Sequence, residues 1–218
     1  MQVSTPVIST KTMFLALILM ALCVTMTACA SAPRQRHGPP PPRASNNVCM
    51  IFHKYPNWYW EALDTYYRWK IPISVQMAIM QRESDFQAGA RPPTKKILGF
   101  IPWGSVTSAY GYAQALNGTW RDYQQETQKY HTKRDKFGDA SDFIGWYAYK
   151  ANQQLGIALS DAYNLYLAYH EGLAGYKNKT YLQKPWLLNL AKTVQAKANL
   201  YRRQISQCKY YIAKVKRS

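Results

Sequence analysis

The sequence predicts one mainly helical domain of the α+β type, with a loop region and a short hairpin beside the helices. Apolar residues recur at helical spacing through most of the chain after residue 57, behind residues that typically begin helices. One stretch rich in glycine and proline, residues 89–118, interrupts that pattern and is typical of loops with a hairpin. With 218 residues and 47% hydrophobic content, the chain can bury a core, and it contains no internal repeat.

The first two predicted helices precede the loop region. Residues 57–69 form an aromatic-rich helix, and Pro72 opens a second that runs to about Ser84, since proline is favoured in a first helical turn. The second helix is apolar on more than one face, through Ile73, Val75, Met77, Ala78, Ile79 and Met80. A helix with so little polar surface is predicted to be central in the fold.

Four more helices are predicted from capping residues and terminal glycines: one from Thr119, with Asp122 three positions on, one from Ser141 to near Gly156, one from Ser160 to Gly172 and one from Pro185 toward Cys208. The folded domain is expected to span residues 48–218, with the tail KVKRS loose.

The N-terminal residues predict export. Lys11 precedes the apolar run MFLALILMALCVTMTA, and small residues stand just before Cys29, as in a secretory signal over residues 1–28. This arrangement resembles the lipobox of bacterial lipoproteins, in which the cysteine is acylated, although Met26 stands where leucine is preferred. Residues 29–47 would then be a lipid anchor and a Pro-rich basic tether. Ala30 after Cys29 favours the outer membrane, facing the periplasm; an ordinary cleaved signal is the alternative.

Two further cysteines, Cys49 and Cys208, lie near opposite ends of the folded region. An exported protein folds in an oxidising compartment, so a disulfide between them is expected, with two free thiols as the alternative. No His/Cys cluster accompanies either residue, so we expect no metal site.

The formal charge of +17 indicates an anionic partner. Nucleic acid, an anionic lipid surface and an acidic cell-wall polymer would all qualify, and the export signal argues against nucleic acid. The chain is also rich in tyrosine (18) and tryptophan (7), rings that line sugar-binding surfaces but also pack cores.

Glu83 is the first candidate catalytic residue. It lies at the end of the apolar stretch QMAIMQRESDF, one turn after Ile79 and Met80. Burial against such neighbours disfavours the charged carboxylate and raises its pKa, as a general acid near neutral pH requires. The alternative is a glutamate that reaches solvent or pairs with Arg82 or another basic group.

Three motifs in order then resemble the soluble-type lytic transglycosylases, which share a fold with goose-type lysozyme. They are Glu83-Ser84-Asp85-Phe86, then Gly111-Tyr112-Ala113-Gln114 followed by Thr119-Trp120, and Ala168-Tyr169-His170-Glu171-Gly172. The resemblance covers roughly residues 72–176. It implies a lysozyme-like fold and cleavage of peptidoglycan glycan strands between muramic acid and glucosamine, without a cofactor.

The resemblance also implies roles for single residues. Glu83 would protonate the glycosidic oxygen and then act as base while a 1,6-anhydro ring closes. Tyr169 would hydrogen-bond near the acid, Gln114 would contact substrate amides and Ser108 would orient the acid or sugar. Core packing is the alternative for Tyr169, and backbone hydrogen bonding is the alternative for Gln114.

The chain departs from the family motifs at several positions. Tyr112 and Ala113 replace Leu-Met, so the wall under one sugar would differ, and His170 and Glu171 replace Asn-Ala beside the site. The segment 91–107 is longer than usual and holds Lys95, Lys96, Phe100 and Trp103.

Glu171 is the only serious candidate for a second carboxylate, which a hydrolase would need. A lysozyme-like hydrolase that uses Glu171 is therefore one alternative. A non-catalytic peptidoglycan-binding lipoprotein of the same fold is another. The sequence leaves open whether the protein joins an envelope complex.

Overall fold

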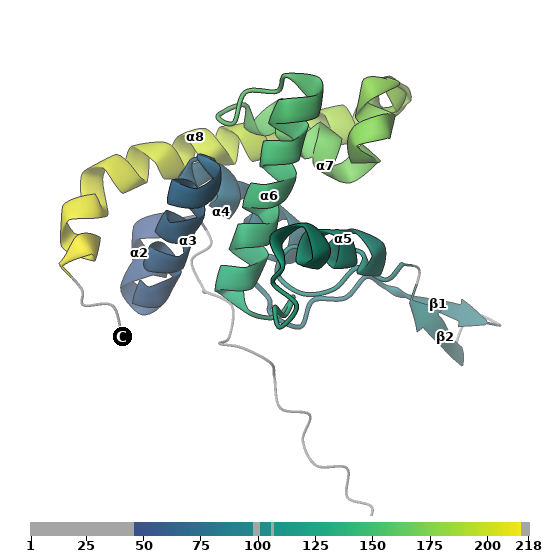
Figure 1. Cartoon of the computed structure of the whole chain (residues 1–218), viewed down its shortest axis with the longest axis horizontal. Helices are drawn as coiled ribbons and strands as arrows, with labels where there is room; N and C mark the ends of the chain where they lie inside the picture. The colour runs from purple at the N-terminus through teal and green to yellow at the C-terminus, as the bar shows by residue number, and fades with distance from the viewer. Residues whose placement is uncertain (1–45, 98–100, 106, 215–218) are drawn as a thin grey trace, which may run out of the picture. The chain divides into compact units, whose positions relative to one another are not determined.

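The computed structural model describes residues 46–97, 101–105 and 107–214, which belong to one compact unit (Figure 1). The predicted signal, Cys29, most of the tether and nearly all of the C-terminal tail lie outside these residues. In the described part of the chain, no helix is long and apolar enough to cross a membrane.

The described unit is mainly helical, which confirms the predicted fold class. Its elements in chain order are α2 (Val48–Lys54), α3 (Pro56–Trp69), α4 (Ile73–Ser84), β1 (Thr94–Ile97), β2 (Ile101–Ser105), α5 (Asn117–Thr127), α6 (Phe137–Leu155), α7 (Ala162–Lys177), the 3-10 helix η2 (Thr180–Gln183) and α8 (Pro185–Ala213). Strands β1 and β2 pair antiparallel and form the short hairpin expected in the loop region.

Helix α4 is central, as its apolar sequence predicts. It contacts α3, α6, α7 and α8, and Met77, Ala78 and Met80 have no exposed surface. Its one fully buried polar side chain, Gln76, donates to the carbonyls of Ala62 (3.1 Å) and Ile71 (2.9 Å). These bonds satisfy a buried amide and fix the orientation of α4 against α3.

Several helix starts differ from the prediction. Helix α6 begins at Phe137, one turn before Ser141, and the Ser141 hydroxyl donates to Gln76 (2.7 Å) inside the core rather than capping the helix. Helix α5 begins at Asn117 rather than Thr119. Asp161 rather than Ser160 caps α7, accepting a hydrogen bond from the Asn164 amide. Such shifts are expected, because sequence patterns define helix ends poorly.

Helix α7 is broken where the sequence predicted its end. Gly172 has φ 76° and ψ 160°, outside the helical region, and a further helical stretch follows to Lys177. A positive φ of this kind favours glycine because other residues place a Cβ in conflict with the backbone.

The two ends of the described unit are joined as predicted. Helix α2, which the sequence analysis missed, packs against α8, the long yellow helix of Figure 1. A disulfide links Cys49 on α2 to Cys208 on α8, with 6.0 Å between the Cα atoms. It holds the start of the domain on its last helix.

Candidate active site

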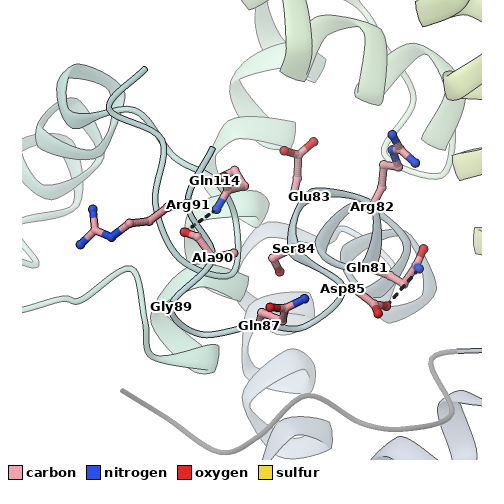
Figure 2. Close-up of a pocket in the computed structure, with 10 residues that line it drawn as sticks. All are labelled: Gln81, Arg82, Glu83, Ser84, Asp85, Gln87, Gly89, Ala90, Arg91 and Gln114. Atoms are coloured by element: carbon pink, nitrogen blue, oxygen red, sulfur yellow. Dashed lines mark hydrogen bonds between the residues drawn. The ribbon is translucent and has the colours of Figure 1, made fainter. Parts of the chain in front are cut away.

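Glu83 lies in the last turn of α4, at a pocket of about 490 Å³ (Figure 2). The chain leaves the helix sharply, because Asp85 and Phe86 both take left-handed conformations (φ 47° and 60°), and Phe86 is fully buried. The Ser84 hydroxyl donates to the carbonyl of Tyr112 (2.8 Å), which fastens this turn to the following loop. The fold therefore holds the Glu83 backbone rigidly at the pocket.

Burial is the main influence on Glu83. It raises the pKa of this carboxyl group from an ordinary value of 4.5 to about 7. A hydrogen bond from Tyr166 and the positive charge of Arg82 act in the opposite direction. A substantial fraction of Glu83 is consequently protonated near neutral pH, as a general acid must be.

Two tyrosines of α7 surround this carboxyl group. The Tyr166 hydroxyl forms the hydrogen bond with Glu83, and it also accepts one from Arg82. The Tyr169 hydroxyl instead donates to the carbonyl of Ala113 (2.6 Å). Burial and the nearby charge of Glu83 raise the pKa of Tyr169 well above its usual range, so it remains a neutral donor. Tyr169 thus lies close to the acid and supports the loop that faces it.

The loop that carries Gln114 is held by backbone and arginine contacts. Gly111 donates its amide to Ala90 (2.9 Å), and Tyr112 donates its amide to the carbonyl of Arg134 (3.1 Å). The Arg134 guanidinium in turn donates to the carbonyls of Ser108 (2.9 Å) and Ala115 (2.7 Å). Both ends of the loop are therefore fixed by one arginine.

Gln114 stands at the edge of the Glu83 pocket and of a second pocket of about 220 Å³. Its amide nitrogen donates to the carbonyls of Ala90 (3.0 Å) and Gly111 (2.8 Å), as the dashed line to Ala90 shows in Figure 2. These bonds use the NH₂ group to hold the loop. The backbone-binding role considered as the alternative is present, and the side-chain carbonyl remains the group that could face a substrate amide.

The second pocket is lined mostly by apolar and aromatic side chains. Its lining comprises Gln114, Ala115, Leu116, Thr119, Phe143, Tyr147, Tyr169, His170, Glu171 and Gly172. Two of the three motifs therefore meet at this pocket, and Gln114 connects it to the pocket of Glu83. An aromatic-lined groove of this kind suits the apolar faces of sugar rings.

The Glu171 carboxylate forms an ion pair and several hydrogen bonds. It pairs with Lys184 (2.8 and 3.0 Å), accepts from the Thr180 hydroxyl and contacts His170 Nδ1 (3.2 Å). The Lys184 and Thr180 hydrogen bonds lower the pKa of Glu171 to about 2. Glu171 is thus an ionised clamp between α7, η2 and the start of α8, and His170 next to it rests edge-on against Trp186 (5.2 Å).

The structure corrects one predicted substrate contact and places another outside both pockets. Tyr112 has no exposed surface and packs against Trp58 and Phe137, so it is a core residue and not a sugar contact. Ser108 is exposed and lines neither pocket, and its hydroxyl accepts from the amide of Asn117 (3.1 Å) at the start of α5. A motif position does not specify which way its side chain points.

Three residues of the site were not singled out from the sequence: Tyr166 beside Glu83, Arg91 in the lining of its pocket, and Arg134, which holds the loop of Gln114. Tyr166 could have been found, because it stands three residues before Tyr169 on the same helical face. The two arginines carry no local signal, since their partners come from distant parts of the chain. Among the described residues, no group of three or more His, Cys, Asp or Glu side chains is arranged to hold a metal ion.

Comparison with known proteins assigns the chain to a family. The sequence matches the family described as the Transglycosylase SLT domain over residues 17–208, and the chain belongs to this family. The family has a mainly helical, lysozyme-like fold and comprises lytic transglycosylases, which act on peptidoglycan in the cell envelope. No curated protein and no solved structure shows significant similarity to the chain.

Proposed function

We propose that this lytic transglycosylase cleaves the bond between muramic acid and glucosamine with Glu83 as its single acid and base, leaving 1,6-anhydro-muramic ends. The observation that carries the proposal is the partly buried Glu83 carboxyl group, whose pKa of about 7 leaves a proton available at the pocket. A group with this pKa can give up a proton and take one back at the same pH.

The reaction follows from this property. Protonated Glu83 donates to the glycosidic oxygen, the bond from that oxygen to C1 of muramic acid breaks, and positive charge develops on the sugar. The Glu83 carboxylate then removes the proton from the 6-hydroxyl of the same sugar while O6 bonds to C1. The proton count balances, and no water is consumed.

The other carboxylates near the site support a single-acid mechanism. Asp85 lines the same pocket, but its Oδ1 accepts from Gln81 (3.2 Å), and its side chain lies on the Gln81 side in Figure 2. Glu171 is tied to Lys184 and Thr180. Neither is placed to activate a water, as the second carboxylate of an inverting hydrolase does.

The roles of the neighbouring residues follow from their contacts. Tyr166 and Tyr169 position and desolvate the acid, and Gln114 offers its side-chain carbonyl to a sugar acetamide. The second pocket, with His170 and Glu171 at its border, would hold a neighbouring sugar.

A digest of purified sacculi tests the enzymatic role of Glu83. The wild-type chain should release muropeptides, and Glu83→Gln, which keeps the shape of the side chain, should reduce release by at least about a hundredfold. Glu126→Gln is the matched control, because Glu126, on α5, pairs with Lys150 on α6 and lines neither pocket. Unchanged release by Glu83→Gln would refute the proposal. No release by the wild type would favour a non-catalytic wall-binding protein.

We also propose that the chain is a lipoprotein anchored through Cys29 to the outer membrane and facing the periplasm. The signal pattern before Cys29 supports this, and the disulfide between Cys49 and Cys208 suits an oxidising compartment. Metabolic labelling with a fatty acid should mark the wild type but not Cys29→Ser. Label retained by Cys29→Ser, or a wild type found in the soluble fraction, would contradict the anchor.

A further inference from the structure

We propose that Arg82 and Arg91 form an anion-binding rim on the Glu83 pocket, which receives a free carboxylate of the peptide carried by the reacting muramic acid. The inference rests on the proposed function and adds to it a preference for glycan strands that still carry their peptides. The two arginines come from different segments, the last turn of α4 and the turn after Ala90, and both line the pocket.

The guanidinium groups lie on opposite sides of Glu83 in the view of Figure 2. Both side chains belong to exposed residues, so an incoming ligand can reach them. An acidic group entering the pocket would therefore meet positive charge on either side of the acid.

Arg91 is held near Tyr110 by a cation–π contact. Its guanidinium carbon lies over the Tyr110 ring, 4.4 Å from the ring centre. Such a contact uses none of the N–H groups of the guanidinium as hydrogen-bond donors, so they remain available for a carboxylate. Arg134 also lies over Tyr110 (5.3 Å), but its NH1 group already donates to two backbone carbonyls.

The two rim arginines are not neutralised by acidic partners. Within the described residues, the salt bridges of the chain involve neither Arg82 nor Arg91. The lining holds two arginines against the Asp85 carboxylate and Glu83, which is partly uncharged near neutral pH. The pocket therefore presents a small excess of positive charge, which uncharged sugar rings would not neutralise.

Peptidoglycan carries negative charge on the same sugar unit that reacts. Muramic acid contributes the C1 of the cleaved bond, and the same sugar carries the peptide through its lactyl group. The free carboxylates of that peptide are therefore tethered to the ring held at Glu83 by a short flexible chain, which can reach the rim of the pocket. A glycan stripped of its peptides has the same sugars and lacks these anions.

A comparison of two substrates tests the rim. The full-length protein is given glycan strands that carry peptides, and the same strands after an amidase has removed them, both below saturation. We expect the wild type to cleave peptide-bearing strands roughly three- to tenfold faster, the range of a partly exposed charge pair. The preference should shrink in high salt, which screens exposed charges.

Arg91→Gln is the decisive variant, because Arg82 also contacts Tyr166 and its loss would disturb Glu83. In Arg91→Gln the ratio of the two rates should fall toward one. Arg121→Gln removes the same charge from an exposed position on α5 outside both pockets and should keep the wild-type ratio.

The possible results distinguish a failure of the anion-binding rim from a failure of the proposed function. Equal cleavage of both substrates by the wild type, or an unchanged ratio in Arg91→Gln, would overturn the rim and leave the proposed function standing. Cleavage of neither substrate by the wild type would overturn both. Thermal midpoints of the variants establish that a changed ratio does not come from unfolding.

Discussion

The Tyr166 hydroxyl on α7 forms a hydrogen bond with the Glu83 carboxyl group at the end of α4. Two helices that are distant in sequence thus meet at the acid. Burial raises the pKa of Glu83 to about 7, and this bond acts against the rise by stabilising the ionised form. The balance of the two sets the pH at which Glu83 exchanges its proton.

Removal of that hydroxyl should change the pH profile. In the wild type, activity should fall as pH rises through about 7, because Glu83 loses its proton there. Tyr166→Phe removes a bond that favours the charged form, so the alkaline limb should move to higher pH. Activity at about pH 6 should change by less than about tenfold, since Glu83 remains.

Tyr163→Phe is the matched control for this variant. Tyr163 lies one turn earlier on α7, and its hydroxyl lines neither pocket. Its profile should coincide with that of the wild type. An alkaline limb that stays in place in Tyr166→Phe, with wild-type thermal stability, would show that Tyr166 does not act on Glu83.

Ionisation of Glu83 should also lower the free energy of unfolding as pH rises. Its pKa is 4.5 in an exposed setting and about 7 in the fold, so between these values the folded state binds more protons than the unfolded state. The free energy of unfolding therefore falls as pH rises through this window. Glu83→Gln removes the penalty, and it should raise stability by up to about 3 kcal/mol near pH 8 and change it little near pH 4.5.

Denaturant unfolding of both proteins at the two pH values measures this effect. Glu126→Gln again serves as control and should lose stability, because Lys150 lowers the pKa of Glu126. A Glu83→Gln variant that is equally or less stable than the wild type near pH 8 would mean that Glu83 is not held in a desolvated site.

Glu171 should act as a structural clamp. Lys184 and Thr180 hold its pKa at about 2, so its stabilising contribution is present above about pH 4.5 and is lost as pH falls toward 2. Glu171→Gln should cost about 1–2 kcal/mol of stability at neutral pH, discounted because Lys184 is 40% exposed. Cleavage should fall by less than about tenfold, with the same products.

Lys184→Met tests the clamp from its other side. It should lower stability by a similar amount in thermal melts and leave the products unchanged. If a well-folded Glu171→Gln loses cleavage as completely as Glu83→Gln, then Glu171 takes part in the chemistry and a hydrolase becomes the better account.

Gly111 should tolerate no side chain. Its φ is +78°, and a Cβ at this position would lie 2.1 Å from the carbonyl oxygen of Arg134. Gly111→Ala should therefore unfold the protein or destabilise it by more than about 3 kcal/mol, because backbone atoms must move. Gly118→Ala has open space and a helical position, so it should be neutral or stabilising by up to about 1 kcal/mol. Equal thermal midpoints for both variants would contradict this account of the loop.

The sequence predicted the elements whose signals are local. The apolar faces of α4, Pro72 and Pro185 at helix starts and the glycines after α6 and within α7 are all where the pattern indicates. The desolvation of Glu83 was predicted from Ile79 and Met80 on the same helix, and its catalytic role stays a proposal. Helix α2 was missed because its seven residues are too few for a periodic pattern.

The rest of the site depends on tertiary contacts. Tyr112 was misassigned because its motif position does not reveal that its ring packs against Trp58 in the core. The Tyr166 bond, the Arg134 contacts and the pairing of Glu171 with Lys184 join segments that only folding brings together. No local pattern encodes such pairs, so the ionised state of Glu171 required the structure.

The most direct test of the single-acid mechanism is a digest of sacculi in water enriched in heavy oxygen, followed by mass spectrometry of the muropeptides. The account predicts 1,6-anhydro ends that lack the heavy isotope in the wild type, and no new ends in Glu83→Gln. New reducing ends that carry the heavy isotope would show that water attacks the sugar, and would contradict the central claim.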